Sequence, residues 1–273
     1  MRCLSLFASL LLLGLSSCAA DQTTHPPLLD CSNDNCKTSS GAHSVSGSSS
    51  NGGASSSGTS GAAGQVTLTG QVVQVDEPNY SVSKGTPAND NYTIVVPGAN
   101  GTDLSNSNLA PIFSVDGVRS SNAIWVTAKP MVANDFMAGV VALNSTTTTN
   151  VTVPVVRQSS LEMVGLANTS PVTLNSLAGQ VVMHFVDNTG ASVKGIRATF
   201  SGAEAIIYDS VGGYTVDNSV GTGTRGLIFL LNVSASKTPL STTVSLTGTV
   251  TAQFSFFVMA NAATALEVLV SPN

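Results

Sequence analysis

From Gln65 onward, short apolar runs alternate with clusters of Gly, Asn, Asp, Ser and Pro. Val, Ile, Thr and Phe dominate the runs, as they do in β-strands, and the clusters between them are typical of turns. Clear turn signals stand at residues 187–190 and 211–213. No strong helical period interrupts the pattern, although residues 261–270 fit either a helix or a final strand. The sequence therefore predicts an all-β protein made of antiparallel sandwiches.

The predicted strands form two sets of six. The first set comprises residues 66–75, 92–96, 112–115, 123–128, 137–143 and 151–156. The second set comprises residues 180–186, 195–200, 205–208, 226–233, 243–250 and 252–258.

The two sets contain a weak internal repeat. Residues 68–73 match residues 177–182, and Ile112-Phe113 corresponds to Ile228-Phe229, at offsets of 109 and 116 residues. A period of this length is that of a domain rather than of a solenoid repeat. Chance is the alternative, because the shared residue types are common in β-proteins. We expect two tandem β-sandwich domains, residues 65–160 and 161–273.

The second set also resembles a known family. A strand that ends at Asp187-Asn188-Thr189-Gly190 is followed by Val193-Lys194-Gly195-Ile196, and then by an apolar strand over residues 226–233. This order resembles the carboxypeptidase-regulatory-like domains, although the long loop over residues 208–226 departs from the family. The resemblance implies an Ig-like, prealbumin-like sandwich for this half of the chain, with an accessory, spacer or ligand-binding role.

The first 17 residues have the pattern of a secretion signal. A basic start precedes an apolar run from Leu4 to Leu15, which is too short to span a bilayer comfortably. The run ends in Leu15-Ser16-Ser17-Cys18, which resembles the lipobox of bacterial lipoproteins. The resemblance implies that residues 1–17 are removed and that Cys18 is acylated, for example with palmitate. With Ala19 in second place it also implies the outer membrane, on either the surface or the periplasmic face. An ordinary signal peptide is the alternative.

Residues 18–64 predict a flexible tether. Between Ser39 and Gly64, 11 of 26 residues are Ser and seven are Gly, so the segment has too little apolar surface to offset its ordering entropy. We expect a disordered spacer. Cys31 and Cys36 lie within it, and outside the cytoplasm they favour a local disulfide. A metal site would require more ligands at suitable spacing, and none is expected.

Composition excludes some function classes. Only 9% of residues are charged and the formal net charge is −5, so the chain is poorly suited to neutralise nucleic-acid phosphates. No catalytic motif or cofactor loop is evident, and we expect neither an enzyme nor a bound cofactor. His184 is the only histidine beyond residue 64, and strand alternation places it opposite Met183 and Phe185, on a solvent-facing side.

Two hypotheses follow. The first is a non-enzymatic lipoprotein of the bacterial cell envelope, anchored in lipid through Cys18, that presents two β-sandwich modules for a structural or protein-binding role. The second is a carbohydrate-binding surface module that uses Trp125, Tyr208 or Tyr214 as stacking platforms. The envelope protein or glycan that would be the partner is not specified by the sequence.

Overall fold

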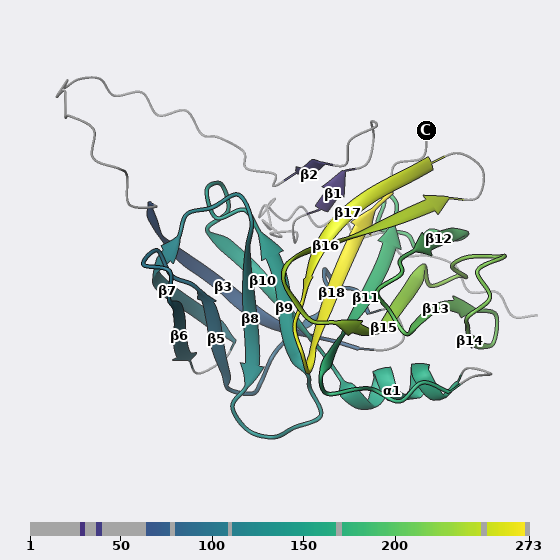
Figure 1. Cartoon of the computed structure of the whole chain (residues 1–273), viewed down its shortest axis with the longest axis horizontal. Helices are drawn as coiled ribbons and strands as arrows, with labels where there is room; N and C mark the ends of the chain where they lie inside the picture. Colours follow the sequence, from purple (N-terminus) through teal and green to yellow (C-terminus); the bar gives the residue numbers. More distant parts are fainter. Residues whose placement is uncertain are drawn as a thin grey trace, which may run out of the picture.

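The computed structural model describes residues 28–30, 37–39, 64–76, 80–108, 111–167, 171–246 and 250–270. Regular structure in these residues is almost entirely β-strand, with one short helix, α1 (Gln158–Leu166) (Figure 1). The prediction of an all-β protein is therefore confirmed. No helix among the described residues is both long enough and apolar enough to cross a membrane.

The strands form three larger sheets and one small hairpin. The nine-stranded central sheet has the order β14 (Gly213–Thr215), β13 (Ala205–Ser210), β15 (Leu227–Ser234), β11 (Ala178–Val186), β18 (Ala262–Leu269), β9 (Ala138–Leu143), β8 (Ile124–Pro130), β5 (Tyr92–Pro97) and β6 (Asp103–Asn108). A second sheet contains β10 (Asn150–Val156), β3 (Gln65–Val75), β4 (Thr86–Pro87) and β7 (Ile112–Arg119). The third contains β12 (Ile196–Thr199), β16 (Ser236–Leu246) and β17 (Val250–Val258). The hairpin pairs β1 (Leu28–Asp30) with β2 (Lys37–Ser39).

The chain builds two sandwiches, each with its own core. In the first, β3, β7 and β10 pack on β5, β8 and β9, with Phe113 and Ile94 among the buried residues. In the second, β16 and β17 pack on β11 and β15, where Phe185, Phe254 and Phe256 are buried. Burial of one such side chain stabilises a fold by about 1.5–3 kcal/mol. The cores therefore account for the two sets of apolar runs in the sequence.

A third core joins the two sandwiches. Val75 and Tyr80 from the first set of residues pack with Leu161 of α1 and with Phe229 and Ala263 of the second set. The central sheet also runs through both sandwiches, because β9 pairs with β18. The predicted division between residues 160 and 161 falls inside α1, a helix that the sequence pattern did not indicate.

The same strand arrangement occurs twice. β3, the first strand of one sandwich, lies between β7, which is antiparallel to it, and β10, which is parallel. β11, the first strand of the other, lies between antiparallel β15 and parallel β18. The matched segments of the internal repeat thus occupy equivalent places. The parallel pairings were not part of the predicted antiparallel sandwiches, because side-chain alternation within a strand carries no information about the direction of its neighbour.

The turn at Asp187–Gly190 forms as predicted. The Oδ1 atom of Asp187 accepts hydrogen bonds from the backbone N–H groups of Thr189 and Ala191, at 2.8 and 3.0 Å. The hydrogen bond from the Thr189 hydroxyl, together with these two backbone bonds, lowers the pKa of Asp187. Gly190 has a φ of +78°, a conformation that suits glycine.

Candidate binding site between strands β9 and β18

The central sheet is split where its two sandwiches meet. β18 pairs with β11 over seven residues, from Gln180↔Ala263 to Val186↔Leu269. It pairs with β9 at only two positions, Ala262↔Ala138 and Ala263↔Gly139. Beyond these positions the described strands show no pairing between β9 and β18. Each strand follows the twist of its own sandwich, so the two parallel edges diverge towards their carboxyl ends.

Gly139 holds the closed end of this split. A Cβ atom at Gly139 would lie 2.0 Å from the carbonyl oxygen of Pro154, so only glycine allows β9 to approach β10 this closely. From Val140 onward, β9 continues with the first sandwich while β18 continues beside β11. The backbone groups that point into the gap are those that would pair with a further strand.

A cavity of about 180 Å³ occupies the gap. We call it the β9–β18 cleft, and its apolar walls come from β9, β10, β16, β17 and β18 and from Val82. Its lining includes Val82, Val141, Ala142, Leu143, Pro154, Phe257, Ala265, Leu266 and Glu267, with Asn144, Thr148 and Thr152 among the polar members. A mainly apolar gap bordered by two strand edges is suited to an extended polypeptide, which offers backbone hydrogen bonds and alternating side chains.

One wall of the cleft contains a buried polar cluster. Oε2 of Glu267 accepts hydrogen bonds from the hydroxyls of Ser81 and Ser83, at 2.8 and 3.0 Å, and lies 3.7 Å from Nδ1 of His184. Burial raises the pKa of Glu267, but the interactions with His184, Ser81 and Ser83 outweigh it and lower the pKa to about 2. The carboxylate is therefore held in its charged form and ties the segment around Ser81 to β18.

His184 differs from the sequence prediction. It is only 3% exposed, and its Nε2 lies 3.0 Å from the hydroxyl of Ser192. The prediction of a solvent-facing histidine was wrong because it assumed one solvated face, whereas β11 is central and buried on both faces. Ser192, His184 and Glu267 follow the order of a nucleophile, base and carboxylate. Of these three residues, the cleft wall includes Glu267 and neither Ser192 nor His184.

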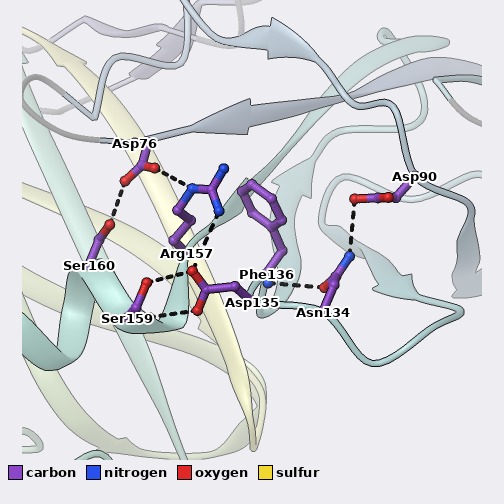
Figure 2. Close-up of polar contacts among 8 residues, drawn as sticks. All are labelled: Asp76, Asp90, Asn134, Asp135, Phe136, Arg157, Ser159 and Ser160. Carbon is purple, nitrogen blue, oxygen red and sulfur yellow. Dashed lines mark hydrogen bonds and ion pairs between the residues drawn. The ribbon is translucent and has the colours of Figure 1, made fainter.

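A second polar cluster lies where the chain enters β9 and α1 (Figure 2). Nε of Arg157 lies 2.6 Å from Oδ2 of Asp76, and its Nη1 lies 3.5 Å from Oδ2 of Asp135. The guanidinium also lies 4.5 Å from the centre of the Phe136 ring. The hydroxyls of Ser159 and Ser160, in the first turn of α1, donate to Asp135 and Asp76 respectively.

This cluster fastens three segments together. It joins the end of β3, the entry to β9 and the start of α1, and backbone bonds from Met137 to Val156 and from Gln158 to Asp135 reinforce it. The hydrogen bonds from Ser159, together with Arg157, lower the pKa of Asp135. The side chain of Arg157 does not cap α1; instead Oδ1 of Asp135 accepts the backbone N–H of Ser159 at 3.1 Å, and the backbone oxygen of Asp135 accepts that of Gln158.

Replacing Arg157 with alanine is expected to lower the free energy of unfolding by about 1–2 kcal/mol. The estimate is modest because the ion pairs are partly exposed, and it includes the contact with Phe136. Urea unfolding provides the measurement. Lys129→Ala, at an exposed position of β8, is the matched control and should change stability by less than about 0.5 kcal/mol. Equal effects of the two substitutions would contradict the role given to Arg157.

The candidate sugar-binding residues do not share a site. Trp125 on β8 is partly buried and packs with Val140, Phe257 and Ala262. Tyr208 on β13 is 1% exposed, and its hydroxyl bonds to the backbone of Ala198. Five strand steps separate β8 from β13 in the central sheet, which is about 24 Å along the sheet.

Tyr214 lies on β14, near Tyr208 but in different contacts. Its hydroxyl lies 3.1 Å from Nη1 of Arg225, whose guanidinium stacks on the ring at 4.6 Å, and its edge meets Phe229. Tyr208, but not Tyr214, lines an open depression of about 450 Å³. The two tyrosines thus face separate surroundings.

The predicted lipidation site and the predicted disulfide lie in a part of the chain that the structure does not describe. Cys18, Cys31 and Cys36 lie outside the described residues, as does most of the predicted tether. Strands β1 and β2, which flank Cys31 and Cys36, pair antiparallel with Asp30 opposite Lys37. Among the described residues, no group of three or more His, Cys, Asp or Glu could hold a metal ion.

Neither cleft nor cluster was evident from the sequence. The apolar residues of β9 and β18 have the pattern of ordinary strands. This pattern does not indicate that the two strands diverge. The one available signal is glycine at position 139 before the run Val140-Val141-Ala142-Leu143, since a glycine in a strand marks a close backbone approach.

Comparison of the sequence with protein-family models and with curated proteins gives no match. Among solved structures, the chain is similar to a streptococcal ancillary pilin, with 10% identity, a TM-score of 0.21, and coverage of 76% of this chain and 69% of that one. It is also similar to the shaft pilin SpaA from Lactobacillus rhamnosus GG (a double mutant), with 10% identity, a TM-score of 0.22, and coverage of 77% and 98%. A third is the Bacillus anthracis TIE protein, with 11% identity, a TM-score of 0.21, and coverage of 76% and 34%. These values do not assign the chain to a family.

Proposed function

We propose that the protein is a non-enzymatic, lipid-anchored component of the bacterial cell envelope that binds an extended segment of polypeptide in the β9–β18 cleft. The observation that carries this proposal is the split in the central sheet. Two strand edges diverge from Ala138 and Ala262, with a mainly apolar cavity between them. An added strand would satisfy the backbone groups of an edge and place alternate side chains against the apolar walls.

The anchor and the tether support the same role. Acylation of Cys18 would hold the chain in the membrane, and 46 residues, 19–64, separate that cysteine from β3. A fully extended segment of this length reaches roughly 150 Å. The folded units could therefore meet a partner well away from the lipid. Ala19 at the second mature position favours the outer membrane, with either face possible.

Crosslinking in intact cells tests the binding proposal. A photoreactive amino acid at Ala142, in the cleft wall, is expected to give adducts with extended segments of polypeptide, identified by mass spectrometry. The control places the same amino acid at Val211, which is 94% exposed and does not line the cleft. Adducts only to lipid or sugar at Ala142, or the same adducts at both positions, would contradict the proposal.

Replacing Cys18 with serine is expected to abolish incorporation of labelled palmitate and to release the protein from the membrane fraction. A serine hydroxyl is not the thiol to which the lipid attaches, and loss of the acyl chains removes about 0.8 kcal/mol of membrane affinity per buried CH₂. Cys31→Ser is the control and should leave labelling unchanged. Labelled Cys18→Ser protein would show that the anchor lies elsewhere.

A further inference from the structure

The hairpin of the N-terminal tether lies close to β18. The backbone of β1 (Leu28–Asp30) comes near that of β18, and β1 pairs antiparallel with β2. Figure 1 shows the hairpin at the end of the central sheet opposite α1, which is the end towards which β9 and β18 diverge. A strand of this chain thus lies near β18, the strand that forms one side of the split.

We propose that β1 docks in cis as an added strand on the edge of β18, and that this docking sets how far the folded units stand from the membrane. The inference rests on the proposed function, because it takes the cleft to be a strand-binding site and names the chain's own tether as its occupant. A longer extended segment from a partner would compete with β1 for the same edge.

The connection between β1–β2 and the folded part allows docking in cis. Residues 40–64 join β2 to β3, a segment of 25 residues with an expected root-mean-square span of about 25–30 Å. A linker of about this length gives a local concentration on the order of millimolar. A three-residue strand with a few hydrogen bonds of about 1 kcal/mol each would have a dissociation constant on the order of millimolar, so it is partly docked in cis.

Docking would change the reach of the anchor. With β1 held at the cleft, only nine residues, 19–27, separate Cys18 from the folded unit, which is roughly 30 Å when extended. With β1 released, all 46 residues are available, roughly 150 Å. A partner segment that displaces β1 would have two effects. The cleft would bind the partner, and the folded units could move further from the membrane.

Hydrogen–deuterium exchange of the full lipidated chain in detergent tests this inference. Amides of residues 140–143 and 264–269 are expected to exchange about threefold faster in the double variant Leu28→Pro/Leu29→Pro, because proline has no N–H and cannot pair as a central strand. The control is Ser48→Pro/Ser49→Pro, in the same tether but outside β1 and β2, which should match the parent. Equal exchange in the parent and the Leu28→Pro/Leu29→Pro variant would overturn the inference.

Two additions separate this inference from the proposed function. Protection of the parent that rises with protein concentration would assign the strand to a second copy and overturn docking in cis.

A synthetic peptide of residues 26–40, with both cysteines replaced by serine, is then added to the double-proline variant. Restored protection supports β1 as the occupant. If this peptide gives no protection but an octapeptide of alternating valine and threonine does, β1 is not the occupant. The proposal that the cleft binds a strand then still stands. No protection by either peptide overturns both.

Discussion

Replacing Asp209 with alanine is expected to lower the free energy of unfolding by about 4 kcal/mol. Asp209 is fully buried on β13, and its carboxylate accepts backbone N–H bonds from Gly223, Arg225 and Leu227 at 2.8–2.9 Å. Alanine removes this acceptor, and although the N–H of Gly223 keeps its bond to the backbone oxygen of residue 209, those of Arg225 and Leu227 lose theirs. A buried donor without a partner costs about 1–3 kcal/mol. Urea unfolding followed by circular dichroism measures the change.

Asp217→Ala is the matched control for Asp209. Asp217 is exposed in the same long loop and accepts the backbone N–H of Ser219 at 2.8 Å. Its loss should cost no more than about 1 kcal/mol, because water can replace the carboxylate. Asp209→Asn should fall between the two, since its oxygen can keep the bonds to Gly223 and Leu227 but its amide faces the N–H of Arg225. A loss at Asp209 no larger than that at Asp217 would contradict this account of the loop.

Replacing Glu267 with glutamine is expected to lower stability at pH 7 by on the order of 2–3 kcal/mol. The pKa of Glu267 is about 2 in the folded chain, against an ordinary value of 4.5. A depressed pKa means that the charged carboxylate stabilises the fold above the unfolded-state pKa, and that this stability is lost as pH falls through the folded-state pKa. The difference between parent and variant should therefore shrink between about pH 4.5 and pH 2.

Unfolding by urea across pH 2 to 7 measures this difference. Glu162→Gln is the control, because Glu162 is half-buried on α1 and accepts an exposed hydrogen bond from Gln158. Its effect on stability should be small. A pH-independent difference for Glu267→Gln would show that the serine and histidine contacts do not select the charged carboxylate.

Local patterns in the sequence predict where the strands of this fold lie better than they predict how the strands pair into sheets. Alternation in Tyr92–Pro97 matches an alternating pattern of burial, and the turn at Asp187–Gly190 follows from an aspartate and a glycine at fixed spacing. The ambiguous segment 261–270 forms β18, because it completes the sheet beside β11. Its pattern could not decide this, since a buried strand and a buried helix segment are both continuously apolar.

The site depends on contacts that no local pattern specifies. Glu267 meets Ser81 and Ser83 across more than 180 residues of sequence, and His184 joins them only because β11 is covered on both faces. The split between β9 and β18 arises where two sandwiches with separate twists share a sheet. The internal repeat indicated two sandwiches but not the pairing between them.

The most direct test of the account is whether the cleft binds a strand through its backbone. Exchange of amides in residues 140–143 and 264–269 is measured in the Leu28→Pro/Leu29→Pro variant with an octapeptide of alternating valine and threonine that carries terminal lysines. We predict protection by this peptide and at least about tenfold weaker binding when every second amide is N-methylated, because methylation removes the pairing donors and keeps the side chains. Equal binding of the two peptides, or no protection by either, would contradict strand addition at the β9–β18 cleft.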